Sequence, residues 1–150
     1  MNDLIYKEDC YKIIGGCFEV YKEKGCGFLE PVYHESLAIE FELRGIPFVS
    51  KPLQTLQSRG RTLVQTFAPD FFCYDQIILE IKAASALVAE HRAQVLNYLS
   101  ATGCKLALLV NFGHYSRLEY ERLIPRTLEP VDLRLRKFRV FRVFRGQRNL

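Results

Sequence analysis

Two carboxylates and an ammonium group interrupt an apolar, strand-like stretch in the middle of the chain. The stretch reads "TFAPDFFCYDQIILEIKAAS" and contains Asp70, Glu80 and Lys82. An unpaired ionised group in an apolar interior costs several kcal/mol, so such side chains need partners, a metal ion or a wet cleft. These three residues are therefore the first candidates for chemistry. An ion-pair network on the face of a sheet is the structural alternative for the same three residues.

The spacing of these residues predicts that the two carboxylates converge. Glu80 and Lys82 are two residues apart on one predicted strand, so their side chains point to the same face. A tight connection near residues 74–76 places Asp70 roughly opposite residue 80 or 81 of the next strand, within the ~5 Å that separates cross-strand neighbours. Two oxygen donors beside a main-chain carbonyl suit a hard divalent cation, here Mg²⁺, with Mn²⁺ as its substitute.

The elements that must position these residues follow from the hydrophobic pattern. Apolar residues recur at helical spacing in three segments, and three strand-like segments with short links lie between the second and third helices. The run "KLALLVNF" has the continuous apolar pattern of a buried central strand. The expected order α-α-β-β-β-α-β defines an α/β fold with a mixed sheet flanked by helices. The expected helices cover about 4–24, 28–44 and 86–102, and the expected strands 47–57, 62–72, 77–83 and 105–112.

Length and composition bound the class of protein. The chain has 150 residues, of which 49% are hydrophobic and 25% charged, as in a folded domain with its own core. No apolar run reaches the ~18 residues of a membrane span, and the N-terminus lacks the pattern of a secretory signal, so a cytoplasmic location is expected. The cysteine count of five is odd, with no C-x-x-C pair. Reduced core thiols are expected.

The positive charge is concentrated at the C-terminus. Residues 1–125 carry 13 Lys and Arg against 15 Asp and Glu, whereas residues 126–150 carry 8 against 2. We therefore expect a domain over 1–125 and a basic, aromatic extension over 126–150 that attracts a polyanion. Candidate substrate contacts in the extension are Arg136, Arg139 and Arg142. Their three-residue period fits neither a helix nor a strand, so a late edge strand and a short helix are both open for this segment.

Four motifs in order resemble a known family. The pair "PD" at Pro69–Asp70 and the triplet "EIK" at Glu80–Lys82 resemble the signature of the PD-(D/E)XK nuclease superfamily. Upstream, "GFLEPVY" at Gly27–Tyr33 resembles the G-x-x-E-x-x-Y pattern of the GxxExxY family. Residues 91–113 are similar to that family's helix with a Q-x-x-x-Y element and the strand after it. The resemblance spans roughly residues 5–120 and implies a restriction-endonuclease-like fold.

The resemblance implies a role for each matching residue of the cleft. Asp70 and Glu80 would be metal ligands, and Ile81 would lend its carbonyl oxygen. Glu30 would complete the metal site directly or through water, although Pro31 directly after it places Glu30 in the first helical turn. Lys82 would sit beside the attacked phosphate, where we assign it to orienting water and stabilising charge. In the same resemblance, Gln94 and Tyr98 would line the cleft and help to hold substrate or Lys82; core hydrogen bonding is the alternative for both. We expect Tyr33 to pack in the core.

The expected function is a Mg²⁺-dependent nuclease that hydrolyses phosphodiester bonds, with DNA as its partner. Such a reaction needs an activated water and charge neutralisation at the phosphate, which a divalent ion supplies. The alternative is a non-cleaving nucleic-acid-binding or protein-assembly module on the same fold. The acidic set favours the nuclease, because carboxylates repel phosphate unless a cation intervenes. A homodimer is left open, since a chain this short can need a second copy to hold its substrate.

Overall fold

The computed structural model describes residues 5–126, so nearly all of the basic extension, with Arg136, Arg139 and Arg142, lies outside the described residues. Within residues 5–126 no helix is both long and apolar enough to cross a membrane. The helices are α1 (Lys7–Lys24), α2 (Glu30–Arg44) and α3 (Ala89–Thr102), and the strands are β1 (Phe48–Ser50), β2 (Gln54–Ser58), β3 (Arg61–Phe67), β4 (Phe71–Cys73), β5 (Ile77–Lys82), β6 (Leu106–Asn111) and β7 (Glu119–Leu123).

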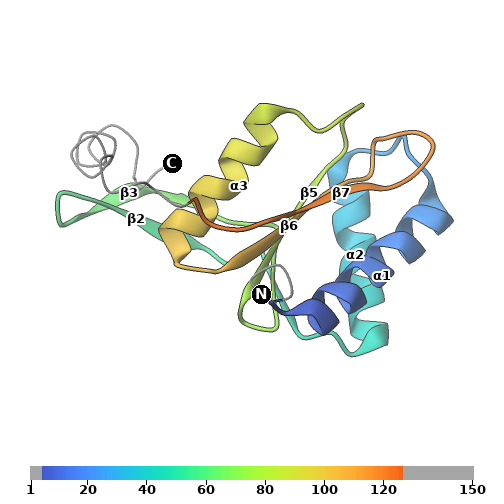
Figure 1. Ribbon diagram of the computed structural model, residues 1–150, viewed down its shortest axis with the longest axis horizontal. Helices are drawn as coiled ribbons and strands as arrows, with labels where there is room; N and C mark the ends of the chain where they lie inside the picture. Colours follow the sequence, from blue (N-terminus) through green and yellow to red (C-terminus); the bar gives the residue numbers. More distant parts are fainter. Residues whose placement is uncertain (1–4, 127–150) are drawn as a thin grey trace.

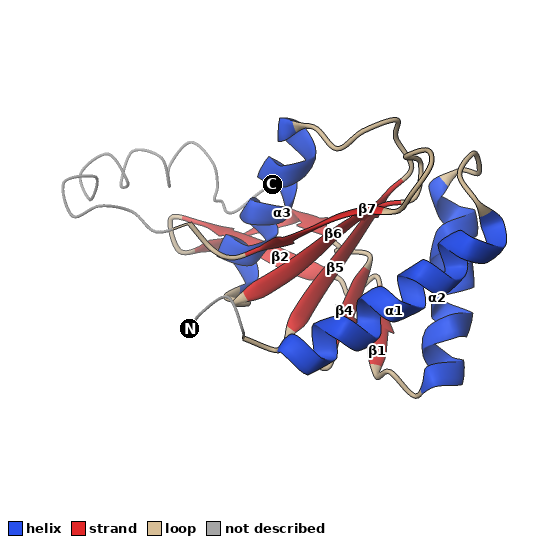
Figure 2. Cartoon of the chain, turned by 45° about the vertical axis from the view of Figure 1, so that its right-hand side comes forward, coloured by secondary structure: helices blue, strands red, loops and turns tan. Residues whose placement is uncertain are grey.

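A five-stranded mixed sheet forms the centre of the protein, in the order β1-β4-β5-β6-β7. Strands β5 and β6 are parallel and the other pairs are antiparallel. Helices α1 and α2 cover one face and α3 covers the other (Figures 1 and 2). The predicted α/β architecture is confirmed, and the three helices begin within three residues of their predicted starts.

The two faces of β5 take alternate residues, as the strand pattern predicted. Ile77, Leu79 and Ile81 pack into the larger hydrophobic cluster with α1 and α2. Ile78 packs into the smaller cluster with α3. Glu80 follows Ile78 on the α3 side, so it leaves the sheet where only one helix covers it. The residues with candidate chemistry therefore lie on the more thinly covered face.

The predicted three-stranded meander is only partly correct. Each of the first two predicted strands breaks in the middle, and the inner pieces form a separate two-stranded sheet, β2–β3. The first break has a backbone cause, because Lys51 has a positive φ of 49° and Pro52 follows it. The second break falls at Ala68–Asp70, where Pro69 removes an amide donor. The outer pieces β1 and β4 still pair antiparallel in the main sheet.

Strand β7 was not predicted. Its sequence "EYERL" has three charged residues in five, and all its side chains are exposed or half-buried. Pairing with the buried β6 forms this edge strand, and one of its glutamates, Glu121, is held by Arg92 of α3 at 2.6 Å. Tertiary pairing overrides a weak local preference here.

Candidate active site

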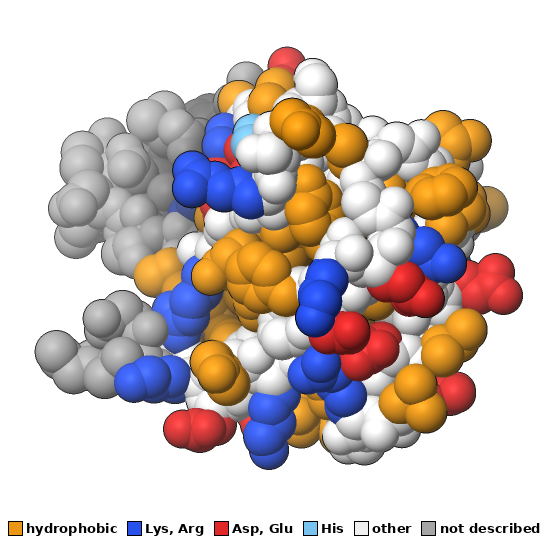
Figure 3. Space-filling view, turned by 90° about the vertical axis from the view of Figure 1, so that its right-hand side faces the viewer, with side chains coloured by type: hydrophobic (Ala, Val, Ile, Leu, Met, Phe, Trp, Pro, Cys, Tyr) orange, Lys and Arg blue, Asp and Glu red, His pale blue; other side chains and the backbone are white. Residues whose placement is uncertain are grey.

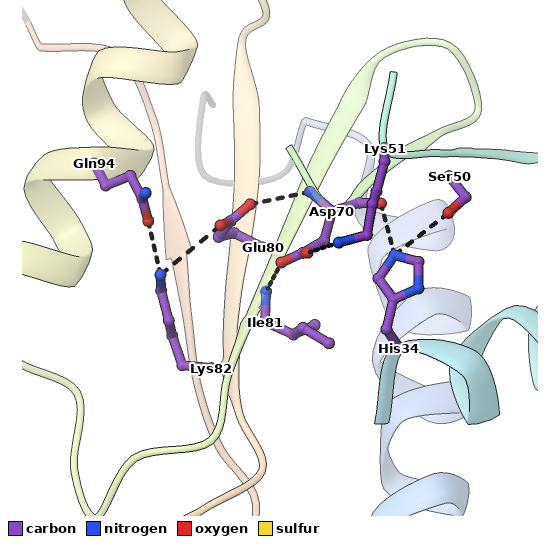
Figure 4. A network of polar contacts seen from close by, with 8 residues as sticks. All are labelled: His34, Ser50, Lys51, Asp70, Glu80, Ile81, Lys82 and Gln94. Atoms are coloured by element: carbon purple, nitrogen blue, oxygen red, sulfur yellow. Dashed lines mark hydrogen bonds and ion pairs between the residues drawn. The ribbon is translucent and has the colours of Figure 1, made fainter. Parts of the chain in front are cut away.

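Asp70 and Glu80 lie opposite each other at the start of the β4–β5 hairpin. Phe71 pairs with Leu79, which places Asp70 opposite Glu80 as the turn spacing predicted. The Asp70 amide donates to Glu80 Oε1 at 3.1 Å, and the Ile81 amide donates to Asp70 Oδ2 at 2.8 Å (Figure 4). Each carboxylate is thus held by a main-chain amide of the opposite segment. Charge-assisted bonds of this kind fix both groups without neutralising them.

Lys82 lies on the same side as Glu80 and is held by helix α3. Its Nζ donates to Gln94 Oε1 at 2.7 Å and lies 3.8 Å from Glu80 Oε2 (Figure 4). Tyr98, one turn further along α3, stacks on Phe67 of β3 at a centroid distance of 4.8 Å. Burial, and then repulsion from the two carboxylates, raises the pKa of Tyr98, so its hydroxyl stays protonated.

The surroundings of Glu80 disfavour the charged form of its carboxyl group. Only 6% of the residue is exposed. Burial, followed by repulsion from Asp70, raises the pKa of Glu80 to about 8, and the charge of Glu30 adds to this. The Asp70 amide and Lys82 act in the opposite direction without cancelling the effect. In the metal-free protein, burial and the neighbouring carboxylates thus disfavour the charged form of Glu80 more than the Asp70 amide and Lys82 favour it.

This donor set fits a hard divalent cation. Within the described part of the chain, the nearest cations are at the outer limit of ion pairing: Lys82 Nζ is 3.8 Å from Glu80, and Lys51 Nζ is 4.0 Å from Asp70. Among residues 5–126, no three His, Cys, Asp or Glu side chains are grouped closely enough to hold a metal ion. Two carboxylates are nevertheless the kind of oxygen donor that hard divalent cations take, often with few protein ligands plus substrate phosphate. The Ile81 amide contacts Asp70, and the use of its carbonyl stays a prediction.

The G-x-x-E-x-x-Y segment positions Glu30 at the first turn of α2. Gly27 has a φ of +118°, which a side chain would strain. The buried Tyr33 hydroxyl donates to the Gly25 carbonyl at 2.6 Å and accepts from the Phe28 amide at 3.2 Å. Tyr33 thus packs in the core, as expected, and also secures the loop. Glu30 itself is exposed and acts on Glu80 through charge, outside the close carboxylate pair.

His34 is a neighbour of the site that sequence reasoning passed over. Its Nε2 lies 3.1 Å from the Asp70 carbonyl oxygen, and its ring stacks on Phe71 at 4.2 Å. The same carbonyl accepts the Lys51 amide at 2.9 Å. His34 follows Glu30 by four residues and so shares its helical face, a signal that could have linked it to the site.

A buried asparagine fixes the loop that follows Lys82. Asn111 is fully buried; its Oδ1 accepts the Ala84 amide and its Nδ2 donates to the Ala84 carbonyl, both at 2.9 Å. Glu119 accepts from Asn111 Nδ2 at 3.0 Å and from the Leu87 amide at 3.1 Å. This cluster ties the loop to β6 and β7 and so sets how α3 faces β5. An asparagine at the end of an apolar run gives no sequence signal of this role.

The protein has a mixed sheet with helices on both faces, and a carboxylate pair and a lysine lie at its central strands. This combination defines a restriction-endonuclease-like α/β domain. A family model described as the PD-(D/E)XK nuclease superfamily matches residues 7–123, and the chain belongs to this superfamily. The solved structure described as "Crystal structure of SSO0001" is similar in fold, with 17% identity and a TM-score of 0.53. That similarity covers 71% of this chain and 55% of the other, about half of its length. A search of curated proteins found no match.

Proposed function

We propose that this protein is a Mg²⁺-dependent nuclease that hydrolyses phosphodiester bonds in DNA, and that within its superfamily it belongs to the GxxExxY family. The observation that carries the proposal is the carboxylate pair of Asp70 and Glu80, held 3.1 Å and 2.8 Å from opposing amides with Lys82 beside it. A nucleic-acid substrate accords with the superfamily. The choice of DNA and of magnesium is our proposal.

Asp70, Glu80 and the Ile81 carbonyl would hold the cation, with Glu30 reaching it through water. The cation would lower the pKa of a water molecule and offset negative charge on the phosphate. Lys82 would orient water and stabilise the negative charge of the phosphate. Gln94 keeps the Lys82 ammonium in place through the 2.7 Å bond. Tyr98 would offer its protonated hydroxyl as a donor along the cleft.

The test measures Mg²⁺ and Mn²⁺ binding by calorimetry and cleavage of labelled DNA in the same preparations. Asp70→Asn and Glu80→Gln should each abolish cation binding and cleavage, because each removes one of two anionic ligands. Asp75→Asn is the matched control. Asp75 lies exposed in the β4–β5 turn with a positive φ of 58°, which asparagine tolerates. This control should bind and cleave like the parent.

A parent protein that binds neither ion, with and without DNA, would contradict the proposal. Cation binding without cleavage of single-stranded or duplex DNA would also contradict it and would favour the non-cleaving module. In that module, retained DNA binding with strong salt dependence would separate a nucleic-acid role from protein assembly through aromatic contacts.

A further inference from the structure

The hairpin formed by β2 and β3 projects from the main sheet (Figure 1). It forms a sheet of its own, and we refer to residues 51–67 as the arm. Most of its side chains are exposed, and Leu56 is its one buried residue. A two-stranded ribbon is marginally stable alone, so an arm of this kind costs stability and calls for a purpose outside the core.

The arm carries positive charge only. No Asp or Glu occurs between Glu42 and Asp70, whereas the arm contains Lys51, Arg59 and Arg61. Elsewhere the charges are mixed, and the face over α1 and α2 shows acidic and basic side chains interspersed (Figure 3). Residues 1–125 as a whole carry two more acidic than basic residues. A ribbon of one sign on an otherwise acidic domain is complementary to a polyanion.

Both ends of the arm are anchored beside the carboxylate pair. At one end, the Lys51 amide donates to the Asp70 carbonyl at 2.9 Å, and Lys51 Nζ lies 4.0 Å from Asp70 Oδ1. At the other end, Phe67 stacks on Tyr98 of α3. The direction of the arm relative to the carboxylate pair is therefore set by contacts at both of its ends.

The tip of the arm is built against local preference. Arg59 and Gly60 form its two-residue turn, with φ values of +52° and +79°. Turns with two positive φ values favour asparagine, aspartate or glycine at the first position, and a residue such as arginine is strained there. An arginine held at that position at the expense of turn stability indicates a use for its side chain.

We propose that the arm lies along duplex DNA and places Arg59 and Arg61 on phosphates remote from the cleaved bond; this rests on the proposed nuclease function. The seven residues of β3 span about 23 Å at roughly 3.3 Å per residue, or about seven base pairs. A two-stranded ribbon fits the ~12 Å major groove of B-form DNA, whereas the deep, narrow groove of duplex RNA excludes it. The arm would thus supply affinity and orientation, and the carboxylate pair the chemistry.

The experiment measures binding of a fluorescent 24-base-pair DNA duplex by anisotropy in EDTA across a salt series. In the Arg59→Asn/Arg61→Gln variant, we expect affinity to fall about ten-fold per arginine at 0.1 M salt, and the slope of log K against log salt to weaken by about two. Asparagine suits the turn, so thermal unfolding reports whether the fold is kept. The control is Lys12→Gln/Lys22→Gln, which removes the same charge from exposed positions on α1, at the other end of the molecule (Figure 1).

Equal affinity and salt slope in variant and parent, with cleavage intact, would overturn the arm and leave the nuclease standing. Weakened binding in the arm variant, with no cleavage by the parent in Mg²⁺, would support the arm and overturn the nuclease. An equal loss of DNA affinity in the α1 control would show that the effect depends only on net charge, and would overturn the proposed role of the arm. An equal loss for duplex RNA would overturn the groove placement. A parent that binds no DNA duplex would overturn the arm and leave the nuclease to the cleavage test.

Discussion

The fold disfavours the charged form of Glu80, and this makes the stability of the metal-free protein depend on pH. The folded-state pKa of about 8 lies above the ordinary value of 4.5. The folded state therefore holds a proton that the unfolded state releases between these values, so stability is full below about pH 4.5 and is lost as pH rises toward 8. At about 1.4 kcal/mol per pKa unit, the loss amounts to a few kcal/mol.

We expect Glu80→Gln to remove this loss, because the amide is neutral throughout. The measurement is urea unfolding in EDTA at pH 5 and pH 8 for parent and variant. The variant should exceed the parent at pH 8, and the two should differ less at pH 5. A parent whose stability is equal at both pH values would refute the electrostatic account. Added Mg²⁺ should raise the stability of the parent at pH 8, but it should not raise that of the variant.

His34 is expected to act as a positioning residue for Asp70. His34→Ala removes the bond to the Asp70 carbonyl and the ring stacked on Phe71, which costs about 1 kcal/mol of stability. We expect kcat to fall roughly ten-fold with KM little changed, since a small displacement of a ligand weakens chemistry more than binding. His34→Gln keeps a donor and should recover most of kcat. Equal losses in both variants would assign His34 to packing alone.

At the scale of elements, the loop between β5 and α3 determines how Lys82 meets Gln94. It depends on a close approach at Gly113, where a Cβ atom would overlap the Ala84 backbone, with the Ala84 nitrogen 2.5 Å away. Gly113→Ala should therefore destabilise the protein by about 1–3 kcal/mol, since the opposing atoms are main chain and cannot yield. Denaturant unfolding checks this value.

Gly15→Ala is the matched control for this prediction. Gly15 lies inside α1, and an added methyl group meets only the end of the flexible Arg44 side chain at 3.3 Å. Because alanine is a better helix former than glycine by about 1 kcal/mol, this variant should be as stable as the parent or more so. Destabilisation by both substitutions to a similar extent would contradict the close-approach argument.

The sequence predicted elements whose own pattern determines them and missed those that depend on partners. The helices and the buried β6 carry strong periodic signals, and the Asp70–Glu80 register followed from a short turn. The division of two apparent strands into β1, β2, β3 and β4 was missed, because a break at Lys51 needs a positive φ that residue type does not indicate. His34 and Asn111 were missed because their contacts are with distant main-chain atoms.

For the whole molecule, we expect the basic extension to contribute charge for substrate binding and little to the stability of the fold. The described residues 5–126 supply two hydrophobic clusters, which pack on the two faces of the main sheet. A chain that ends after Arg126 loses seven Lys and Arg against two acidic residues. We expect it to unfold within a few degrees of the parent Tm but to bind DNA more weakly, with a shallower salt slope. Calorimetric unfolding and anisotropy measure the two effects, and unchanged DNA affinity would exclude the extension from substrate binding.

The backbone bond between Lys51 and Asp70 has a consequence for how such proteins can diversify. The bond brings the two ends of the arm together at the rim of the main sheet. The strand pairing of the main sheet does not include the strands of the arm. A segment with adjoining ends can be lengthened, shortened or exchanged during evolution at little entropic cost. Proteins built on the same main sheet can therefore differ in the arm while the carboxylates beside it stay the same.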